Sequence, residues 1–440
     1  MVEITKMKAE KQKAEKEAFF CTTKELSRLG LEQIPTQFQS HKHLIYSSPA
    51  TLAFNSPGAE GFGVKRAGLA VPDSIMLIVA PGCCGRNTSL ISSMKEYNDR
   101  FYYLMMDETD IVTGRHLKKI PKAVEEICSV CPKKPSVVMI CITCVDALLG
   151  TDMERVCKKA EEQVEIPVRP CYMYALTREG RKPPMVHVRQ SLYSLLEPGK
   201  KKGNVVNLLG FFSPLVDDCE IYDLLHSAGV KTIHEISRCK HYMEYQTMSE
   251  ANFNLVLHHE ARFAAEDFHN RLQIPFIELR RLYQIDKIEN QYHALGNALG
   301  VAFYDEKYKK QAEDALEKFR QKCPDASFAI GECLNADPFE LSLALIRYGF
   351  SVPEIYGTIT VENFTYIRSL AKISPETKVF SNMEPTMIYY DPVKSDVNLA
   401  IGKDACYYHP DCPYVMWNGE EQPYGYAGVR RLFEQLLEVV

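Results

Sequence analysis

The sequence lacks several features that would assign a function at once. No stretch reaches the roughly 18 consecutive apolar residues that cross a bilayer, and the lysine-rich N-terminus has no apolar core like that of a signal peptide. Lys and Arg number 52 against 57 Asp and Glu, so the net charge is −5 and no basic excess exists to bind nucleic acid. We therefore expect a cytoplasmic protein that binds neither membranes nor nucleic acid.

Phosphate-binding turns are missing as well. The chain contains neither a G-x-x-x-x-G-K-[ST] loop nor a G-x-G-x-x-G turn at the start of a helix. The turn after the first predicted strand is Pro81-Gly82-Cys83-Cys84-Gly85 instead. If ATP drives this protein, a different protein has to bind it.

Cysteine, in contrast, is abundant. The 440 residues include 15 cysteines, and 46% of the residues are hydrophobic, which is ample for a buried core. Thiols of a cytoplasmic protein are kept reduced, and reduced thiols are available to metals. The cysteine count therefore directs attention to a metal or cluster site.

From residue 74 onward, short β-rich runs alternate with helical stretches, which is typical of parallel sheets with crossover helices. We predict an α/β protein of three Rossmann-like domains with mostly parallel sheets around a central cleft.

Charged residues and Ala or Leu alternate at helical spacing over residues 4–30, which predicts a polar helix, either an arm on a partner subunit or a plain surface helix. The expected divisions are an N-terminal helical arm (1–44), a first α/β domain carrying the cluster cysteines (45–198), a second (199–320), and a third with the C-terminal element (321–440).

Ligands of parallel sheets bind beyond the carboxyl ends of the strands, so residues that directly follow a strand are the first candidates for a functional site. Three segments meet this condition here. They are residues 81–87, 143–146 and 258–260. We expect the chemistry of the protein to lie in these segments.

Spacing alone suggests one alternative metal site. Cys128-x-x-Cys131 and Cys141-x-x-Cys144 together look like a four-cysteine zinc or cluster site. Cys128 and Cys131, however, end a predicted helix that starts near His116, and Cys141 lies inside a predicted strand, where its side chain is buried. We favour Cys128, Cys131 and Cys141 as ordinary thiols and keep the four-cysteine site as the alternative.

Longer segments resemble the nitrogenase component 1 family. Asp107-Glu-Thr-Asp-Ile-Val-Thr-Gly114 and Ile142-Thr-Cys144-Val-Asp-Ala-Leu-Leu-Gly150-Thr-Asp152 resemble its acidic "DIVFGG" stretch and its cysteine loop, and Ala80-Pro-Gly-Cys-Cys-Gly85 resembles its "GPVGCG" turn. Weaker likenesses continue in residues 204–210, 254–277 and 413–428. The family includes nitrogenase subunits, cofactor-assembly scaffolds, and reductases of protochlorophyllide, chlorophyllide and a nickel tetrapyrrole.

The resemblance implies an iron–sulfur cluster bound by Cys84 and Cys144, and leaves open whether Cys83 or Cys141 takes part. A third family cysteine is missing from residues 54–61. Two cysteines per chain at a two-fold interface supply the four thiolates of a [4Fe-4S] cluster. We therefore expect one [4Fe-4S] cluster shared by two subunits in preference to a larger cluster.

The resemblance also implies a division of labour. An ATP-hydrolysing reductase-like partner passes electrons to the cluster, a second component 1-type subunit completes a homo- or heterodimer, and a small-molecule substrate is reduced. His258 aligns with a cofactor-anchoring cysteine of nitrogenase, so it is a candidate ligand or proton donor, although a structural histidine is the simpler interpretation. The alternatives to an oxidoreductase are a cofactor-assembly scaffold and a non-catalytic partner subunit.

Overall fold

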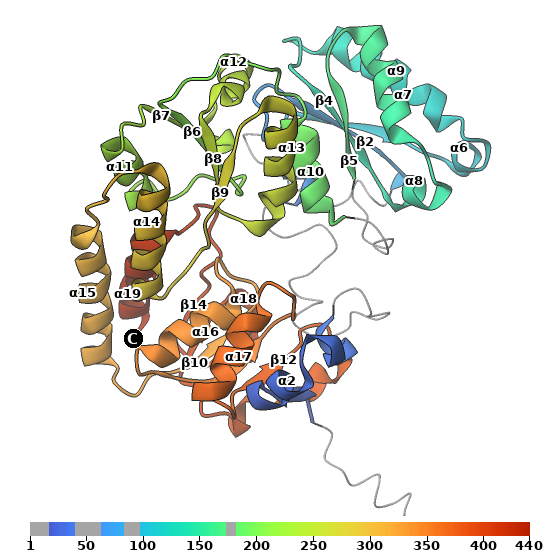
Figure 1. Ribbon diagram of the computed structural model, residues 1–440. Coiled ribbons are helices and arrows are strands. Elements are labelled where there is room, and N and C mark those ends of the chain that lie inside the picture. The colour runs from blue at the N-terminus through green and yellow to red at the C-terminus, as the bar shows by residue number, and fades with distance from the viewer. Residues whose placement is uncertain (1–16, 40–62, 83–96, 173–181) are drawn as a thin grey trace, which may run out of the picture.

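Short strands with buried side chains form three separate sheets. In this computed structural model, which describes residues 17–39, 63–82, 97–172 and 182–440, the three units follow one another around an arc (Figure 1). Central strands are covered on both faces, which is why they can be continuous apolar runs such as Ile75-Met-Leu-Ile-Val-Ala80, in which every residue is buried. The predicted α/β class with mostly parallel sheets is confirmed.

The first sheet has the order β3-β2-β4-β5, and every pair in it is parallel. Its strands are β2 (Ile75–Ala80), β3 (Phe101–Met105), β4 (Val138–Ile142) and β5 (Val168–Tyr172). The helices packed against it include α7 (His116–Val130), α9 (Met153–Val164) and α10 (Pro184–Tyr193). Side chains of β4 alternate between two cores, because Val138, Ile140 and Ile142 belong to one and Met139 and Cys141 to the other.

The second sheet repeats this topology, and the third has the order of a doubly wound fold. The second, β7-β6-β8-β9, consists of β6 (Val205–Leu209), β7 (Thr232–His234), β8 (Phe253–Val256) and β9 (Phe276–Glu278). The third, β1-β12-β11-β10-β13-β14, consists of β10 (Ser327–Ile330), β11 (Ser351–Tyr356), β12 (Lys378–Phe380), β13 (Leu399–Ile401), β14 (Tyr414–Val415) and the added strand β1 (Phe20–Thr22).

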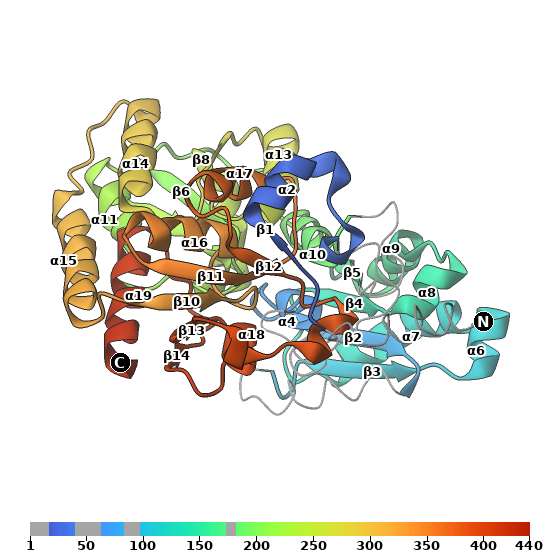
Figure 2. The same cartoon turned by 90° about the horizontal axis from the view of Figure 1, so that it is seen from below.

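The N-terminal segment departs from the predicted helix over residues 4–30. Among its described residues, β1 pairs antiparallel with β12 at the edge of the third sheet, as Figure 2 shows, and only α2 (Thr23–Leu29) is helical. The helix starts at Thr22, whose hydroxyl accepts from the Glu25 N–H while the Glu25 carboxylate accepts from the Thr22 N–H. That capping box fixes the helix start, so the prediction of a helix through residues 20–22 was wrong.

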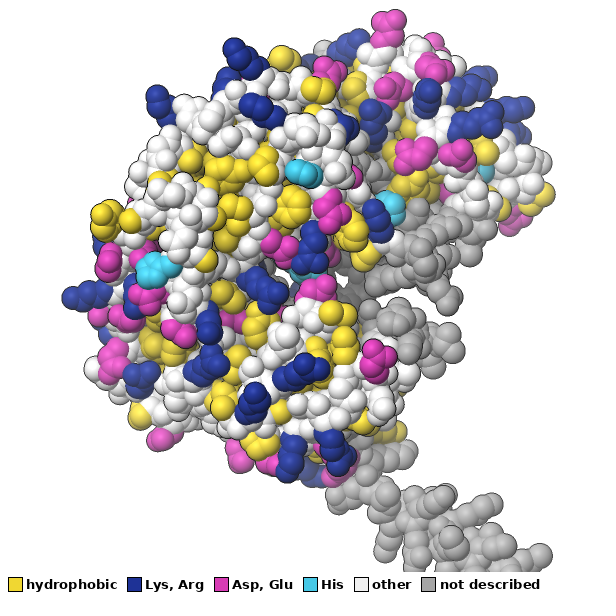
Figure 3. All heavy atoms as spheres, viewed as in Figure 1, with side chains coloured by type: hydrophobic (Ala, Val, Ile, Leu, Met, Phe, Trp, Pro, Cys, Tyr) yellow, Lys and Arg dark blue, Asp and Glu magenta, His cyan; other side chains and the backbone are white. Residues whose placement is uncertain are grey.

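The second unit joins the other two. One apolar core contains Met76 and Ile78 of the first sheet together with Val205 and Val256 of the second. Another core continues from the second sheet into the third. On the face in Figure 3, side chains of both charge signs are interspersed. Within the described ranges, no helix is long and apolar enough to cross a membrane.

A buried carboxylate connects the second unit to the last helix, α19 (Gly425–Val439). Glu220, in α11 (Glu220–Ser227), accepts from the Tyr426 N–H at 2.6 Å, from the Ala427 N–H at 3.0 Å and from the Tyr292 hydroxyl at 2.7 Å. The unpaired N–H groups and the dipole of a helix N-terminus both favour a carboxylate there. Gly425 makes the approach possible, because a Cβ on it would lie 1.9 Å from Glu220 Oε1.

Replacing Glu220 should destabilise the protein strongly. Glu220→Ala leaves two backbone N–H groups and one hydroxyl buried without acceptors, and each such group costs about 1–3 kcal/mol. We therefore expect the free energy of unfolding, measured in urea, to fall by about 3 kcal/mol or more. Glu434→Ala removes only a partly exposed pair with Arg430 and should cost less than about 1 kcal/mol. Equal losses in the two variants would contradict this role of Glu220.

Candidate active site at the first sheet

Each sheet has a crevice where the strand order reverses, and such crevices are where doubly wound folds bind ligands. The reversal lies between β2 and β4 in the first sheet, between β6 and β8 in the second, and between β10 and β13 in the third. The three crevices can be compared by asking which side chains fill them.

The third crevice is closed by Asp404. Its carboxylate accepts from the Glu332 N–H at 2.8 Å and from the Cys333 N–H at 3.0 Å. These two residues lie two and three positions past the end of β10. Gly331 permits this approach, since a Cβ there would lie 2.0 Å from Asp404 Oδ1. Burial raises the pKa of Asp404. An internal carboxylate thus occupies the backbone N–H groups that would otherwise bind an anion.

The second crevice is closed by backbone contact and by Arg189. Gly210 lies just past β6 and His258 just past β8. A Cβ on Gly210 would lie 2.8 Å from the backbone nitrogen of His258. Arg189, from α10, donates two hydrogen bonds to the Gly210 carbonyl, at 3.1 and 2.6 Å, and one to Glu260 at 2.7 Å. The Arg189 guanidinium, each of whose three nitrogens donates at least one hydrogen bond, therefore anchors this edge of the second sheet.

The first crevice contains the segments that the sequence predicts as the site. Val79 of β2 is in register with Ile142 of β4, so the two strands end side by side, about 4.8 Å apart as neighbouring strands are. Cys144 is the first residue of α8 (Cys144–Leu149), two positions past the end of β4. Cys84, like Cys83, lies outside the described residues.

Two buried polar atoms beside Cys144 have no hydrogen-bond partner in the part of the chain that the structure describes. They are Thr143 Oγ1 and Asp146 Oδ2, and both residues are 1% exposed. Leaving such a group unpaired costs about 1–3 kcal/mol, and native proteins rarely do so. The Thr143 hydroxyl can donate to a bound acceptor, whereas Asp146 Oδ2 is an acceptor and needs a donor. The Thr143 hydroxyl therefore fits an iron–sulfur cluster, whose sulfur atoms accept hydrogen bonds and whose iron binds thiolates, but Asp146 Oδ2 does not pair with those sulfur atoms.

A buried histidine–aspartate pair holds this edge together. His116, the first residue of α7, contacts Asp146 Oδ1 through Nε2 at 2.8 Å and the Asp110 carbonyl through Nδ1 at 3.1 Å. The Thr151 hydroxyl also donates to Asp146 Oδ1, at 3.2 Å. The imidazole ring thereby ties α6 (Glu108–Thr113), α7 and α8 to one another.

Asp110, in α6, adds a second buried carboxylate nearby. It accepts from Lys119 Nζ at 2.6 Å and from Arg115 Nε at 2.8 Å, and these hydrogen bonds hold the pKa of Asp110 well below its usual range. Sequence reasoning did not identify His116, Asp110 or Asp146 as a group. Asp110 and Asp146 lie inside the two segments that carry the family resemblance. Their place in those segments was the one sequence feature that could have indicated them.

The alternative four-cysteine site is not formed. Cys128 and Cys131 end α7, and Cys128 is twelve residues beyond His116, so it lies about 18 Å along the helix axis from the carboxyl edge. Cys131 contacts the Tyr102 hydroxyl at 3.1 Å, and Cys141 is fully buried in β4, as the sequence predicts. Among the described residues, no three His, Cys, Asp or Glu side chains are arranged to hold a metal ion.

His258 lies past the end of β8 and starts η7 (His259–Ala261). Its Nδ1 accepts from the Glu260 N–H at 3.4 Å, which leaves the ring hydrogen on Nε2, and the ring packs edge-on against Phe211. Burial, and then the charge of Arg189, lower the pKa of His258 well below its usual value. The ring is thus neutral at neutral pH, and in this tautomer it presents an N–H, not a free metal-binding nitrogen.

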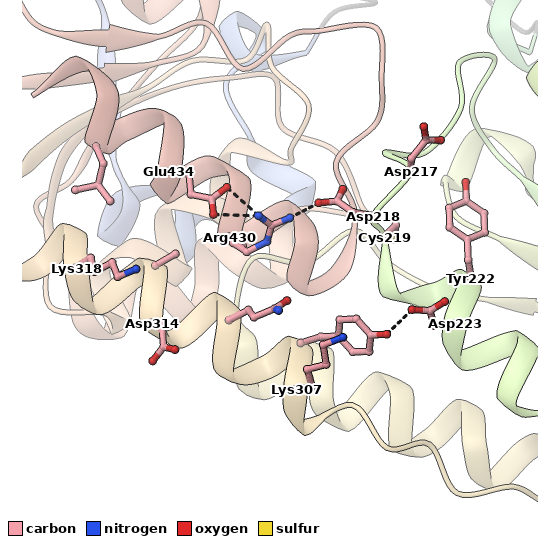
Figure 4. A pocket seen from close by; sticks show the side chains of 14 residues that line it. Asp217, Asp218, Cys219, Tyr222, Asp223, Lys307, Asp314, Lys318, Arg430 and Glu434 are labelled. Atoms are coloured by element: carbon pink, nitrogen blue, oxygen red, sulfur yellow. Dashed lines mark hydrogen bonds and ion pairs between the residues drawn. The ribbon is translucent and has the colours of Figure 1, made fainter.

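A pocket of about 650 Å³ lies elsewhere, between α11, α15 (Glu306–Lys322) and α19 (Figure 4). Arg430 bridges Glu434 and Asp218 across it, and the Tyr308 hydroxyl donates to Asp223. Three of its charged side chains, Asp218, Arg430 and Glu434, therefore pair with one another.

Comparisons with known proteins identify relatives of this chain. A family model described as nitrogenase component 1 type oxidoreductase matches residues 60–440. The nitrogenase iron-molybdenum cofactor biosynthesis protein NifE of Sinorhizobium fredii is 25% identical over 418 residues, which cover 89% of this chain and 82% of that protein. NifE of Nostoc sp. is 25% identical over 284 residues, 61% of this chain and 58% of that protein.

Solved structures show the same fold. The structure titled "Nitrogenase Cp1 at pH 6.5" superimposes with a TM-score of 0.70 at 18% identity, covering 93% of this chain and 96% of that one. A second, "Nitrogenase Cp1 at pH 5", gives a TM-score of 0.64 at 15% identity. At these identities the likeness concerns the fold alone.

Disrupting the buried His116–Asp146 pair should lower the free energy of unfolding more than removing an exposed acidic side chain. Asp146→Ala leaves His116 Nε2 buried without its partner, and disruption of a buried pair costs about 3–5 kcal/mol. We expect such a loss in urea unfolding of metal-free protein. The control is Asp217→Ala, because the Asp217 side chain is 83% exposed beside Arg238, and it should change stability by less than about 1 kcal/mol. A loss below about 1 kcal/mol for Asp146→Ala would refute the role of the pair.

Proposed function

Because the chain belongs to the nitrogenase component 1 type oxidoreductase family, we propose that it is a redox subunit that receives electrons through an iron–sulfur cluster bound by Cys84 and Cys144. One observation carries the proposal. The crevices of the second and third sheets are closed by Arg189 and Asp404. At the first crevice, Thr143 Oγ1 and Asp146 Oδ2 on either side of Cys144 are buried without a partner among the described residues, and this segment also carries the family resemblance.

A [4Fe-4S] cluster needs four thiolates, and this chain offers two, so a second component 1-type subunit supplies the others. Apolar side chains around the crevice support a partner there. Met105 at the end of β3 is 64% exposed, Val112 of α6 is 85% exposed and Leu149 of α8 is 48% exposed. Exposed apolar groups gathered on one edge are typical of interaction surfaces.

The residues of this chain hold that edge rigid and dry. When bound, the cluster stores an electron and passes it on. His116 and Asp146 fix the starts of α7 and α8, and the ion pairs of Asp110 with Arg115 and Lys119 fix α6 beside them. Rigid surroundings lower the reorganisation that each change of charge requires. Because the sequence has no phosphate loop, an ATP-hydrolysing reductase-like protein is the proposed electron donor.

The proposed acceptor is a small molecule near the carboxyl edge of the second sheet. His258 is 33% exposed there, and its Nε2–H is available to donate a hydrogen bond to a substrate. Since its pKa lies well below its usual value, it is proposed to orient the substrate, not to store a proton.

Iron analysis tests the ligand assignment. Anaerobically purified protein should contain about four irons and four sulfides per dimer and give an electron paramagnetic resonance signal after reduction by dithionite. Cys84→Ala and Cys144→Ala should each abolish both. Cys128→Ala is the matched control and should keep the iron, because that thiol lies at the far end of α7. Zinc in place of iron, or full iron content in Cys144→Ala, would overturn the assignment.

A cofactor-assembly scaffold is the second candidate function. The relatives that support it are named as cofactor biosynthesis proteins, and that of Sinorhizobium fredii aligns over 89% of this chain. In a scaffold, the iron-containing group is cargo that leaves for another protein, whereas a redox subunit keeps its iron through repeated cycles.

Isotope-labelled iron separates the two functions. The labelled protein is mixed with a reductase-type ATPase, ATP and a metal-free component 1 protein as acceptor, and the two components are then separated by size or affinity. A redox subunit should retain more than about nine-tenths of the label, since its cluster is bound by thiolates that do not dissociate during electron transfer. Transfer of the label to the acceptor would establish the scaffold and exclude the redox subunit as the main role.

A further inference from the structure

Arginines at the carboxyl edge of the second sheet differ in their partners. Arg189 donates to the Glu260 carboxylate at 2.7 Å. Arg262 donates two hydrogen bonds, at 2.8 and 2.7 Å, to Glu278, the last residue of β9. Arg281 lies three positions past β9, and in the part of the chain that the structure describes it pairs with no carboxylate. Its charge is therefore left without a counter-ion among those residues.

The Arg281 guanidinium uses few of its hydrogen-bond donors. Its Nη2 donates to the side-chain oxygen of Gln422 at 2.6 Å, and its Nε is buried with no partner among the described residues. Its Cζ lies 4.3 Å from the centroid of the Phe211 ring. Burial lowers the pKa of Arg281. Because a desolvated charge without a counter-ion is unfavourable, an anion that paired with Arg281 would stabilise the protein.

Neighbouring strand ends bring Arg281 close to His258. Phe211 and His258 lie two positions past β6 and β8, and the strands β6, β8 and β9 are neighbours in the sheet. The ring centroids of Phe211 and His258 are 5.7 Å apart, so the guanidinium and the imidazole both contact the same aromatic ring. Burial is the main cause of the lowered pKa of His258, and the charge of Arg281 contributes to it. The edge where ligands of such sheets bind thus presents a cation, an apolar ring and an N–H donor.

We propose that Arg281 binds the carboxylate of a carboxylic acid substrate, whose carbon chain lies against Phe211 and whose other end reaches the Nε2–H of His258. This inference rests on the proposed function, because it assigns a chemical class to the small molecule that is reduced. The planar guanidinium matches the geometry of a carboxylate. A neutral substrate would leave the charge of Arg281 unpaired. Arg281 is accordingly a residue that determines specificity.

Binding of simple acids to the full-length, anaerobically purified protein tests the proposal. The probes are succinate, citrate, the uncharged analogue succinamide, and inorganic phosphate, each measured by calorimetry at constant ionic strength. At least one of the two carboxylates should bind. Succinamide and phosphate should bind at least about tenfold more weakly, because they lack the charge or the planar shape that forms paired hydrogen bonds with a guanidinium.

Variants at two neighbouring arginines locate the binding site. Arg281→Gln should raise the Kd of the carboxylate about tenfold or more, since it removes a charge-assisted hydrogen bond. Arg281→Lys keeps the charge without the planar fork, so its Kd should lie between those of the parent and Arg281→Gln. Arg280→Gln is the matched control, because it removes the same charge from an exposed neighbour. It should change the Kd by less than about twofold.

Unfolding in urea distinguishes a binding role from a structural one. Without ligand, Arg281→Gln should unfold at the same or a higher urea concentration than the parent, because it removes a charge that has no counter-ion. With saturating carboxylate, the parent should shift to a higher urea concentration and Arg281→Gln should not. A clear loss of stability in ligand-free Arg281→Gln would indicate a structural arginine and would overturn the proposal.

The outcomes separate this inference from the proposed function. Iron-containing parent protein that binds neither carboxylate would overturn the inference alone. An equal rise of the Kd in Arg280→Gln would also overturn it, since the effect would then come from net charge, and so would phosphate binding more tightly than either carboxylate. Iron-free protein that still binds a carboxylate through Arg281 would overturn the redox function and leave the carboxylate site standing.

Discussion

Parallel pairing of short buried strands is the constraint on which the rest of this structure depends. Parallel strands end at the same edge, and where the strand order reverses, the connections leave in opposite directions and open a crevice. Because the chain builds this arrangement three times, it creates three places at which backbone N–H groups and loop side chains converge. What distinguishes the three units is how those places are filled.

In two units the protein fills the crevice itself. Asp404 accepts from two backbone N–H groups in the third unit, and Arg189 donates to the Gly210 carbonyl in the second. Buried polar groups need partners, so an internal carboxylate or guanidinium is a stable way to pair the backbone groups at the carboxyl edge of a sheet. At the first edge, His116 and Asp146 satisfy each other only in part. Buried polar atoms without a partner among the described residues occur in the other units as well, for example Ser213 Oγ. The first crevice differs in that two such atoms lie on either side of Cys144 in the sequence.

The sequence supported the architecture better than the site. β-rich runs separated by helical stretches predicted the three sheets, and the burial of Cys141 followed from its place inside a strand. The pairing of His116 with Asp146 was not predictable, because the two lie 30 residues apart and neither belongs to a spacing rule. Nor does local sequence reveal that Asp404 and Arg189 enter their crevices, since that depends on loop packing. The strand at Phe20–Thr22 was missed because its partner, β12, is distant in sequence.

That distant pairing bears on how the third sheet forms during synthesis. Phe20 pairs with Phe380, so β1 can join its sheet only after residues 378–380 have been synthesised. Contacts of such long sequence separation form slowly, and unpaired strands are prone to aggregate meanwhile. All strands of the first two sheets precede β10 in the chain, so the pairing of β1 with β12 is a late step that ties the segment at Phe20–Thr22 to the third sheet.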